Sequence, residues 1–228
     1  MADTLSALED TCRYLLGDTG ASPVIDDITL DSWINMAIRD LSVYFPRTVE
    51  YTLSTTANTR AYDLETVHKA VISVEYPTGE DPPVYLKQRS YTHPDFWIED
   101  GYYDFIKPAD ADSLNPPQLY ISEKPPAGET ITLRLHVDHD ELSSGSDACT
   151  LLPRHLPLIP LFVRWKACQR FSTQEGMDPG PLTTLAFTQE INAIRAERAY
   201  RAALEGALQA ESDSGLGVWR SDKFDPIY

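Results

Sequence analysis

The stretch HLPLIPLFVRWKACQRF, residues 155–171, is the part of the sequence that decides the fold. Its apolar residues recur at helical spacing. Its two prolines fall where the first backbone N–H groups of a helix lack an internal partner, so they are tolerated there. The stretch predicts a helix over about 157–172. The expected buried face carries Leu158, Leu161, Phe162, Trp165 and Cys168.

A second, longer helix is predicted downstream. Gly176, Pro179 and Gly180 break the first pattern, and an Ala-rich segment follows over about 181–210. The expected apolar face of this helix carries Leu185, Phe187, Ile191, Ile194, Tyr200, Leu204 and Leu208. Residues 151–210 are therefore interpreted as a C-terminal pair of helices.

The other end of the chain, residues 1–47, also predicts two helices. In the first, over 3–16, the residues at helical spacing are Leu5, Leu8, Cys12 and Leu15, with Gly17 as the stop. The second is expected to be N-capped by Thr29 and to end at Pro46, with an apolar face of Ile34, Ala37, Ile38, Leu41 and Phe45. Each helical end is short of packing partners alone. We therefore expect both ends to build one bundle.

Between these ends, residues 48–150 change from helical to alternating periodicity. Short alternating runs are expected as strands at 49–53, 71–76, 85–87, 119–121 and 131–137, with Pro and Gly between them. No helix long enough for a parallel crossover interrupts the runs, which favours an antiparallel sandwich or barrel. The predicted fold class is α+β: a helical bundle with this β module inserted and an extended C-terminal tail.

The tail, residues 211–228, begins with polar and Gly/Ser residues that cannot offset chain entropy, so we expect it to be mobile in the free protein. Its second half carries Trp219, Phe224, Ile227 and Tyr228 without a helical period. Aromatic side chains of this kind anchor interfaces from buried pockets. We expect the tail to become ordered on docking to a partner. The alternative is that these side chains fold back on their own bundle.

Charge restricts the function. The net charge is −16, and residues 1–46 carry 2 basic and 8 acidic groups, 47–150 carry 8 and 18, and 151–210 carry 7 and 5. An acidic surface repels DNA, so sequestering nucleic acid is disfavoured, whereas a protein that DNA slides past is allowed. Three cysteines without CxxC spacing indicate a reducing compartment. No signal peptide or membrane span is expected, so we expect a soluble protein made in the cytoplasm.

Both helical ends resemble one family. The stretch 155–171, followed by a Gly/Pro break and a long Glu/Ala/Arg helix, is similar to the gatekeeper adaptors, also called tail tubular A proteins, of short-tailed phages. The N-terminal pattern is similar too, from Ala7-Leu8 through Leu15-Leu16-Gly17 to a turn with Pro23-Val24, and then to Phe45-Pro46-Arg47. The resemblance covers about half the chain and leaves out the β module.

The resemblance implies a structural head-to-tail adaptor of the virion neck, without chemistry or a cofactor. Its implied partners are further copies of itself in a dodecameric ring, the portal protein on one face and the tail or nozzle on the other. DNA would pass through an acidic lumen. Adaptors of this family reach the portal through their C-terminal regions, which makes the tail the expected docking element. Its expected portal-docking residues are Trp219, Arg220, Lys223, Phe224, Ile227 and Tyr228.

The alternative is a glycan-binding or glycoside-hydrolysing virion protein. Glu99 with Asp100, or Asp138 with Asp140, could supply paired carboxylates. The nearby aromatic residues that could form a sugar platform are Phe96, Trp97, Tyr102 and Tyr103. However, 18 acidic residues in this module make chance neighbours common, and aromatic residues in strands are usually core.

Two other chemistries need to be weighed. His136, Asp138 and Asp140 alternate onto one face of an extended segment and could reach a metal, although a solvated strand end explains them as well. Cys149 with His155 could form a nucleophilic pair, but no oxyanion device accompanies them. We therefore assign no catalytic, cofactor or metal residues.

Overall fold

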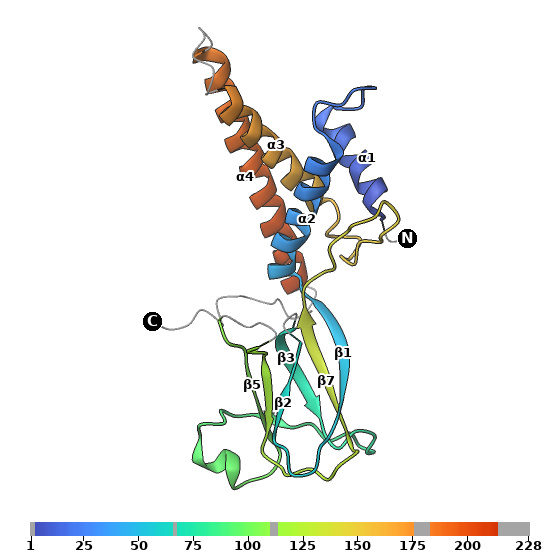
Figure 1. Cartoon of the computed structure of the whole chain (residues 1–228). Helices are drawn as coiled ribbons and strands as arrows, with labels where there is room; N and C mark the ends of the chain where they lie inside the picture. The colour runs from blue at the N-terminus through green and yellow to red at the C-terminus, as the bar shows by residue number, and fades with distance from the viewer. Residues whose placement is uncertain (1–2, 66–67, 110–113, 176–182, 214–228) are drawn as a thin grey trace. The chain divides into compact units, whose positions relative to one another are not determined.

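The computed structural model describes residues 3–65, 68–109, 114–175 and 183–213 (Figure 1). The chain divides into two compact units. The helical unit comprises residues 1–46 and 139–228, and the β unit comprises residues 47–138. Residues 139–150, which the sequence pattern placed in the β module, belong to the helical unit. The reason is packing, since Leu142 and Cys149 are buried in the helical core.

Helix α1 (Leu5–Leu16) lies where the sequence predicted a helix. The side chain of Thr4 caps it, and Gly17 ends it with a φ of 70°, a left-handed conformation that costs glycine little. Its buried residues are Leu5, Leu8 and Cys12. Leu15, predicted on the same face, is 39% exposed.

Helix α2 (Asp27–Tyr44) starts earlier than predicted. Asp26, and not Thr29, is the N-cap, because its carboxylate accepts hydrogen bonds from the backbone N–H and the hydroxyl of Thr29 at 2.8 and 2.9 Å. Asp and Thr are both good caps, so composition alone did not decide between them. The predicted apolar face is confirmed, with Ile34, Ala37, Ile38, Leu41 and Phe45 buried.

Helix α3 (Leu158–Glu175) contains residues 158–171 of the stretch that decides the fold, but its least exposed row is turned from the predicted face. The residues with the least exposure, Ile159, Val163 and Ala167, follow an i, i+4, i+8 row. Leu158 and Phe162 are buried as predicted. Trp165, predicted to be buried, lies outside this row on another side of the helix and is only partly buried, as are Leu161 and Cys168.

Helix α4 (Thr183–Asp213) is longer than predicted at its C-terminal end. It contributes Ala196, Tyr200 and Leu204 to the core. Ile194, predicted on the apolar face, is 44% exposed. Leu185 and Phe187 belong to a part of the helix whose side chains the structure does not describe.

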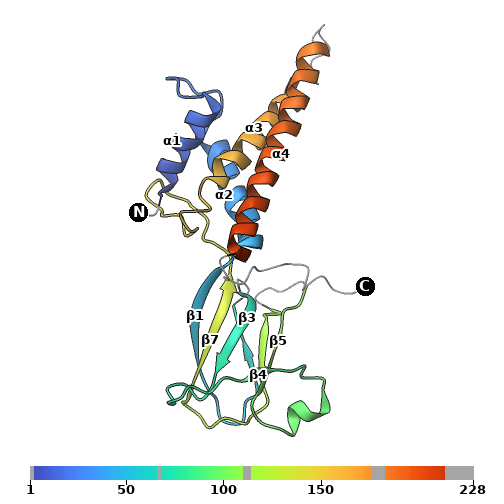
Figure 2. The same ribbon diagram turned by 180° about the vertical axis from the view of Figure 1, so that it is seen from behind.

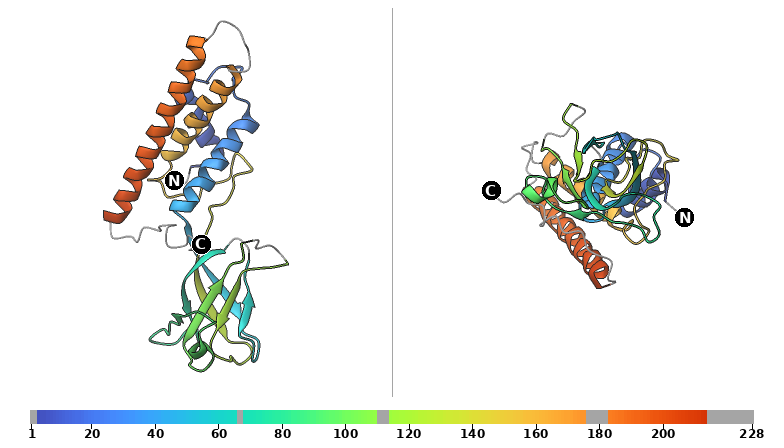
Figure 3. Two further views of the ribbon diagram at one scale, coloured as in Figure 1. Left: turned by 90° about the vertical axis from the view of Figure 1, so that its left-hand side faces the viewer. Right: turned by 90° about the horizontal axis from the view of Figure 1, so that it is seen from below.

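Helices α1, α2, α3 and α4 form one core from both ends of the chain. α3 contacts each of the other three helices, α4 runs alongside it, and α1 lies on the opposite side of α3 from α4 (Figures 1 and 2). Figure 3 shows the pairing of α3 with α4 from another side. The hydroxyl of Tyr200 on α4 donates to Asp40 on α2. The aromatic ring of Tyr200 also packs edge-on against Phe162, with centroids 5.3 Å apart. The bundle predicted from both ends of the chain is confirmed.

The first sheet of the β unit is antiparallel. It contains β1 (Arg47–Ser54), β3 (His68–Glu75) and β7 (Thr130–Val137), in the order β1-β7-β3. Strand β7 is central and is paired with β1 along its whole length. Its alternate residues Ile131, Leu133, Leu135 and Val137 are buried, as the period of two predicts.

The second sheet has the order β2-β6-β5-β4, formed by β2 (Ala61–Asp63), β4 (Lys87–Gln88), β5 (Tyr102–Ile106) and β6 (Gln118–Ile121). Its two-residue β4–β5 pair is parallel, so the sheet is mixed rather than purely antiparallel. A 3₁₀ helix (Pro94–Trp97) precedes β5. Residues of both sheets share one buried cluster, so the β unit is a sandwich. The α+β class, with helices at both ends and sheets in the middle, is confirmed.

Candidate functional site

The end of helix α4 is the described part nearest in sequence to the predicted docking residues. Those residues, Trp219, Arg220, Lys223, Phe224, Ile227 and Tyr228, lie outside the described residues. The tail was predicted to be extended from residue 211, but α4 continues to Asp213. The amide of Gln209 donates to the carboxylate of Asp213 at 2.7 Å across the last turn. The candidate site is therefore the place where this helix ends.

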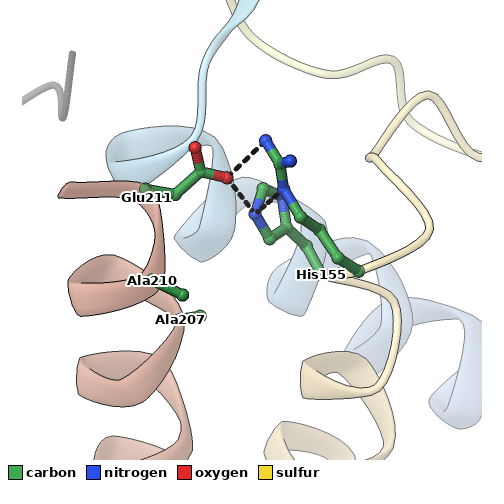
Figure 4. A pocket seen from close by; sticks show the side chains of 5 residues that line it. His155, Ala207, Ala210 and Glu211 are labelled. Atoms are coloured by element: carbon green, nitrogen blue, oxygen red, sulfur yellow. Dashed lines mark hydrogen bonds and ion pairs between the residues drawn. The ribbon is translucent and has the colours of Figure 1, made fainter. Parts of the chain in front are cut away.

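A charged cluster holds this helix end (Figure 4). Arg154 and His155 precede α3, and both reach the same carboxylate oxygen of Glu211 on α4. Arg154 Nη2 lies 2.6 Å from Oε1 of Glu211, and His155 Nε2 lies 2.9 Å from it. These three residues border a hollow of about 280 Å³ with Ala207 and Ala210. We call Arg154, His155 and Glu211 the α4 clamp.

The His155 ring is fixed on its other sides as well. It stacks on Phe45, the C-cap of α2, with ring centroids 3.9 Å apart and planes 19° from parallel. The side chain is 3% exposed, and its buried Nδ1 makes no hydrogen bond. Burial lowers the pKa of His155, and the neighbouring Glu211 carboxylate opposes that shift. The neutral ring therefore donates through Nε2 to Glu211.

A second histidine fixes the end of α2. Nε2 of His139 lies 2.7 Å from the carbonyl oxygen of Phe45, which only accepts, so Nε2 carries the proton. Nδ1 then accepts from the hydroxyl of Thr150 at 2.8 Å. The His139 backbone N–H donates to Ser42 Oγ at 3.1 Å. Together with the α4 clamp, this network ties the ends of α2 and α4 to the segment before α3.

The structure does not support a nucleophile pair at Cys149 and His155. Cys149 is 3% exposed, and burial raises the pKa of its thiol, so the thiolate is disfavoured. His155 Nε2 has two other partners, the carboxylate of Glu211 at 2.9 Å and Nε of Arg154 at 3.4 Å. Each side chain has a structural role in the helical core.

The sugar platform considered as an alternative in the β unit is not formed by the four aromatic residues together. Phe96 and Tyr103 are buried, with exposures of 0% and 4%. Glu99 accepts hydrogen bonds from Arg89 at 3.2 Å and from the Tyr102 hydroxyl at 3.0 Å. This carboxylate is therefore held in a surface ion pair with Arg89.

Two of the residues weighed as possible metal ligands are His136 and Asp138. Asp138 forms an ion pair with Lys69, and burial lowers the pKa of His136. Among residues 3–65, 68–109, 114–175 and 183–213, no group of three or more His, Cys, Asp or Glu side chains comes together to hold a metal. In the same ranges, no helix is long and apolar enough to cross a membrane.

Comparison with known protein families identifies the general role of this protein. The family model described as SU10 adaptor protein matches residues 3–220, which covers both helical ends and the β unit. The chain belongs to the SU10 adaptor protein family. This adaptor is therefore a structural protein of a phage, located in the virion and associating with other head or tail proteins. No curated protein matches its sequence. The likeness to gatekeeper adaptors stays a resemblance.

Sequence reasoning missed the residues that fix the helix ends in this adaptor. Glu211 was assigned to the tail, and His139 and Thr150 to the β module. Local periodicity could not reveal them, because His155 and Glu211 lie 56 residues apart in the chain and His139 and Phe45 lie 94 apart. The one local signal for a longer α4 was the high helix propensity of Glu211, although the helix dipole disfavours an acidic residue in the last turn.

Proposed function

We propose that this protein is the head-to-tail adaptor that joins the portal of a phage to its tail or nozzle, assembled as a ring through which DNA passes. The observation that carries the proposal is the match to an adaptor family over residues 3–220. A ring of twelve copies is the stoichiometry expected from the gatekeeper resemblance. The role requires no catalytic residues.

The division into two units supports a protein that connects two partners. Each unit has its own buried core, so each can present a binding surface without depending on the core of the other. The α4 clamp sets the position within the helical unit from which the C-terminal segment begins. We assign portal docking to that segment and contact with the tail or nozzle to the β unit.

Charge supports passage of DNA rather than binding to it. Residues 47–150 carry 8 basic and 18 acidic groups. Acidic side chains facing a lumen would repel the phosphates and keep DNA mobile. Duplex binding should be undetectable at physiological salt in a filter or anisotropy assay. Micromolar affinity would contradict the repulsive lumen, since it requires several Lys or Arg contacts with phosphates.

The docking assignment is tested by deleting residues 214–228 and measuring attachment to purified portal. The cut leaves Glu211 and the last turn of α4 in place, so we expect unchanged melting and loss of portal binding. A matched variant, Glu211→Ala, removes the clamp but keeps Trp219, Phe224, Ile227 and Tyr228. It should bind portal more weakly, because the docking segment is less well positioned. Undiminished portal binding by the truncated chain would exclude the tail as the docking element.

A further inference from the structure

One edge of the helical unit carries an unusual set of exposed apolar side chains. Tyr14, Val24 and Ile28, from α1, the α1–α2 connection and the first turn of α2, are 82%, 75% and 83% exposed. Arg13, the neighbour of Tyr14, contacts Ile25 and Asp27, which are the neighbours of Val24 and Ile28, so the three stretches of chain lie together. Apolar side chains grouped in this way mark interaction sites more often than scattered single ones do. We call these three residues the turn patch.

Hydrogen bonds and ion pairs hold the backbone that carries the turn patch. Asp18 accepts hydrogen bonds from the backbone N–H groups of Val24 and Ile25 at 2.8 and 3.1 Å. Arg13 pairs with Asp18 and Asp27 and donates to the carbonyl of Ile25 at 3.0 Å. Ile25 fills the core beneath, with 2% exposure. Binding through the patch would therefore cost little additional ordering of the chain.

Acidic groups surround the turn patch. Asp10 lies one helical turn before Tyr14 on α1, so the two share a face, and both are exposed. Asp26 and Asp27 precede Ile28 and are also exposed. Residues 1–46 carry 8 acidic groups and 2 basic ones. A partner for this patch should be apolar at its centre and basic around it.

Helix α4, on the opposite side of α3 from α1, offers that chemistry (Figures 1 and 2). Ile194 is 44% exposed, and Arg195 and Arg198 lie beside it, both exposed. Ala199 and Ala202 continue the same face and are exposed. Their small side chains allow another helix to approach closely. We call these five residues the α4 face.

We propose that the turn patch of one copy docks on the α4 face of the next, with Asp10 and its acidic neighbours meeting Arg195 and Arg198. The two surfaces lie on opposite sides of α3, so the contact is head-to-tail, and such contacts close into rings when the rotation between copies allows it. This inference rests on the proposed function, since it supplies the contact from which a ring would be built. The opposite charges around the contact fix how the two copies align and speed their association.

Two variants separate the two surfaces. Tyr14→Asp/Ile28→Asp removes the turn patch and leaves the α4 face, whereas Arg195→Glu/Arg198→Glu does the reverse. A charge-matched control, Lys87→Glu/Lys124→Glu, changes two exposed lysines of the β unit. All substituted side chains are exposed, so the circular dichroism melts should match that of the unchanged chain.

Sedimentation velocity over a concentration series, up to about 1 mM, measures how strongly each protein self-associates. The unchanged chain and the control should self-associate, and each surface variant should do so at least tenfold more weakly. Mixed in equal amounts, the two variants should form pairs and nothing larger, because each pair joins one intact turn patch to one intact α4 face.

Self-association by either variant at the strength of the unchanged chain would overturn the inference. A mixture that stays monomeric, or an unchanged chain that is monomeric at every concentration, would also overturn it. Portal binding, measured on the same samples, keeps the two proposals apart. If portal binding persists in these cases, the adaptor function stands and only this contact is wrong. Failure of the unchanged chain to bind portal contradicts the proposed function itself.

Discussion

The helical unit and the β unit differ in which parts of the chain build them. The β unit is one continuous segment, residues 47–138, in which the first strand β1 pairs with the last strand β7. The helical unit is assembled from both ends of the chain, and the Tyr200–Asp40 hydrogen bond joins residues 160 apart. A continuous segment can complete its core alone, whereas the helical unit requires both ends to be present. The two units should therefore unfold as separate transitions.

The strongest test of that separation is a pair of core truncations. Phe162→Ala in the helical unit should cost about 3–5 kcal/mol, and Leu133→Ala in the β unit about 2–5 kcal/mol, because both side chains are buried. Each should lower one calorimetric transition and leave the other in place. Trp165→Ala is the control and should cost less than Phe162→Ala, since Trp165 is only partly buried. If either truncation shifted both transitions together, the two units would form one cooperative structure.

A smaller effect should come from Asn35, a residue that joins the two ends of the helical unit. Its side chain donates to the carbonyl of Leu142 at 2.9 Å and accepts from the Leu142 N–H at 2.8 Å. Asn35→Ala leaves both partly buried backbone groups without this partner and should cost about 1–3 kcal/mol. Denaturant melts followed by helical circular dichroism measure it. A loss shared by the β transition would contradict the assignment to the helical unit.

Acidification should weaken the helical unit through His155. Burial places its folded pKa below the ordinary value of 6.5. The unfolded chain therefore binds the proton more readily, and stability is complete above about pH 6.5 and is lost as pH falls towards the folded pKa. Comparing melts at pH 7 and pH 5, His155→Asn should show a shallower pH dependence of the helical transition. An equal dependence in both proteins would remove His155 as the cause.

The smallest expected change has the opposite sign and involves Glu9. Partial burial and the neighbouring Asp31 raise the pKa of Glu9 to about 7 from an ordinary value of 4.5. The folded chain thus holds a proton that the unfolded chain releases, and stability falls as pH rises through this window. Glu9→Gln should raise the melting temperature of the helical unit at pH 8 and have little effect near pH 4. A gain of the same size at both pH values would contradict this explanation.

The two units also differ in how well the sequence predicted them. The alternation of Ile131, Leu133, Leu135 and Val137 was enough to identify β7, because strand burial depends on local period. The short strands β2 and β5 were missed, since three to five residues carry little pattern.

For the helices, the sequence predicted where each helix lies better than it predicted which face of the helix is buried. The predicted face of α3 had Trp165 near its centre, and Trp165 is only partly buried, whereas the least exposed row is Ile159, Val163 and Ala167. Which row faces inward depends on the neighbouring helices, and a single helix does not encode them. The α4 clamp was missed for the same reason, because its partners meet only after both ends of the chain have packed.

The central claim is that this protein joins the portal to the tail. Electron microscopy of the purified adaptor mixed with the portal of the same phage tests it most directly. We predict a ring of adaptor copies seated on one face of the portal, with their helical units against the portal and their β units on the side where the tail would attach. Portal particles that stay bare at saturating adaptor concentration would contradict the account.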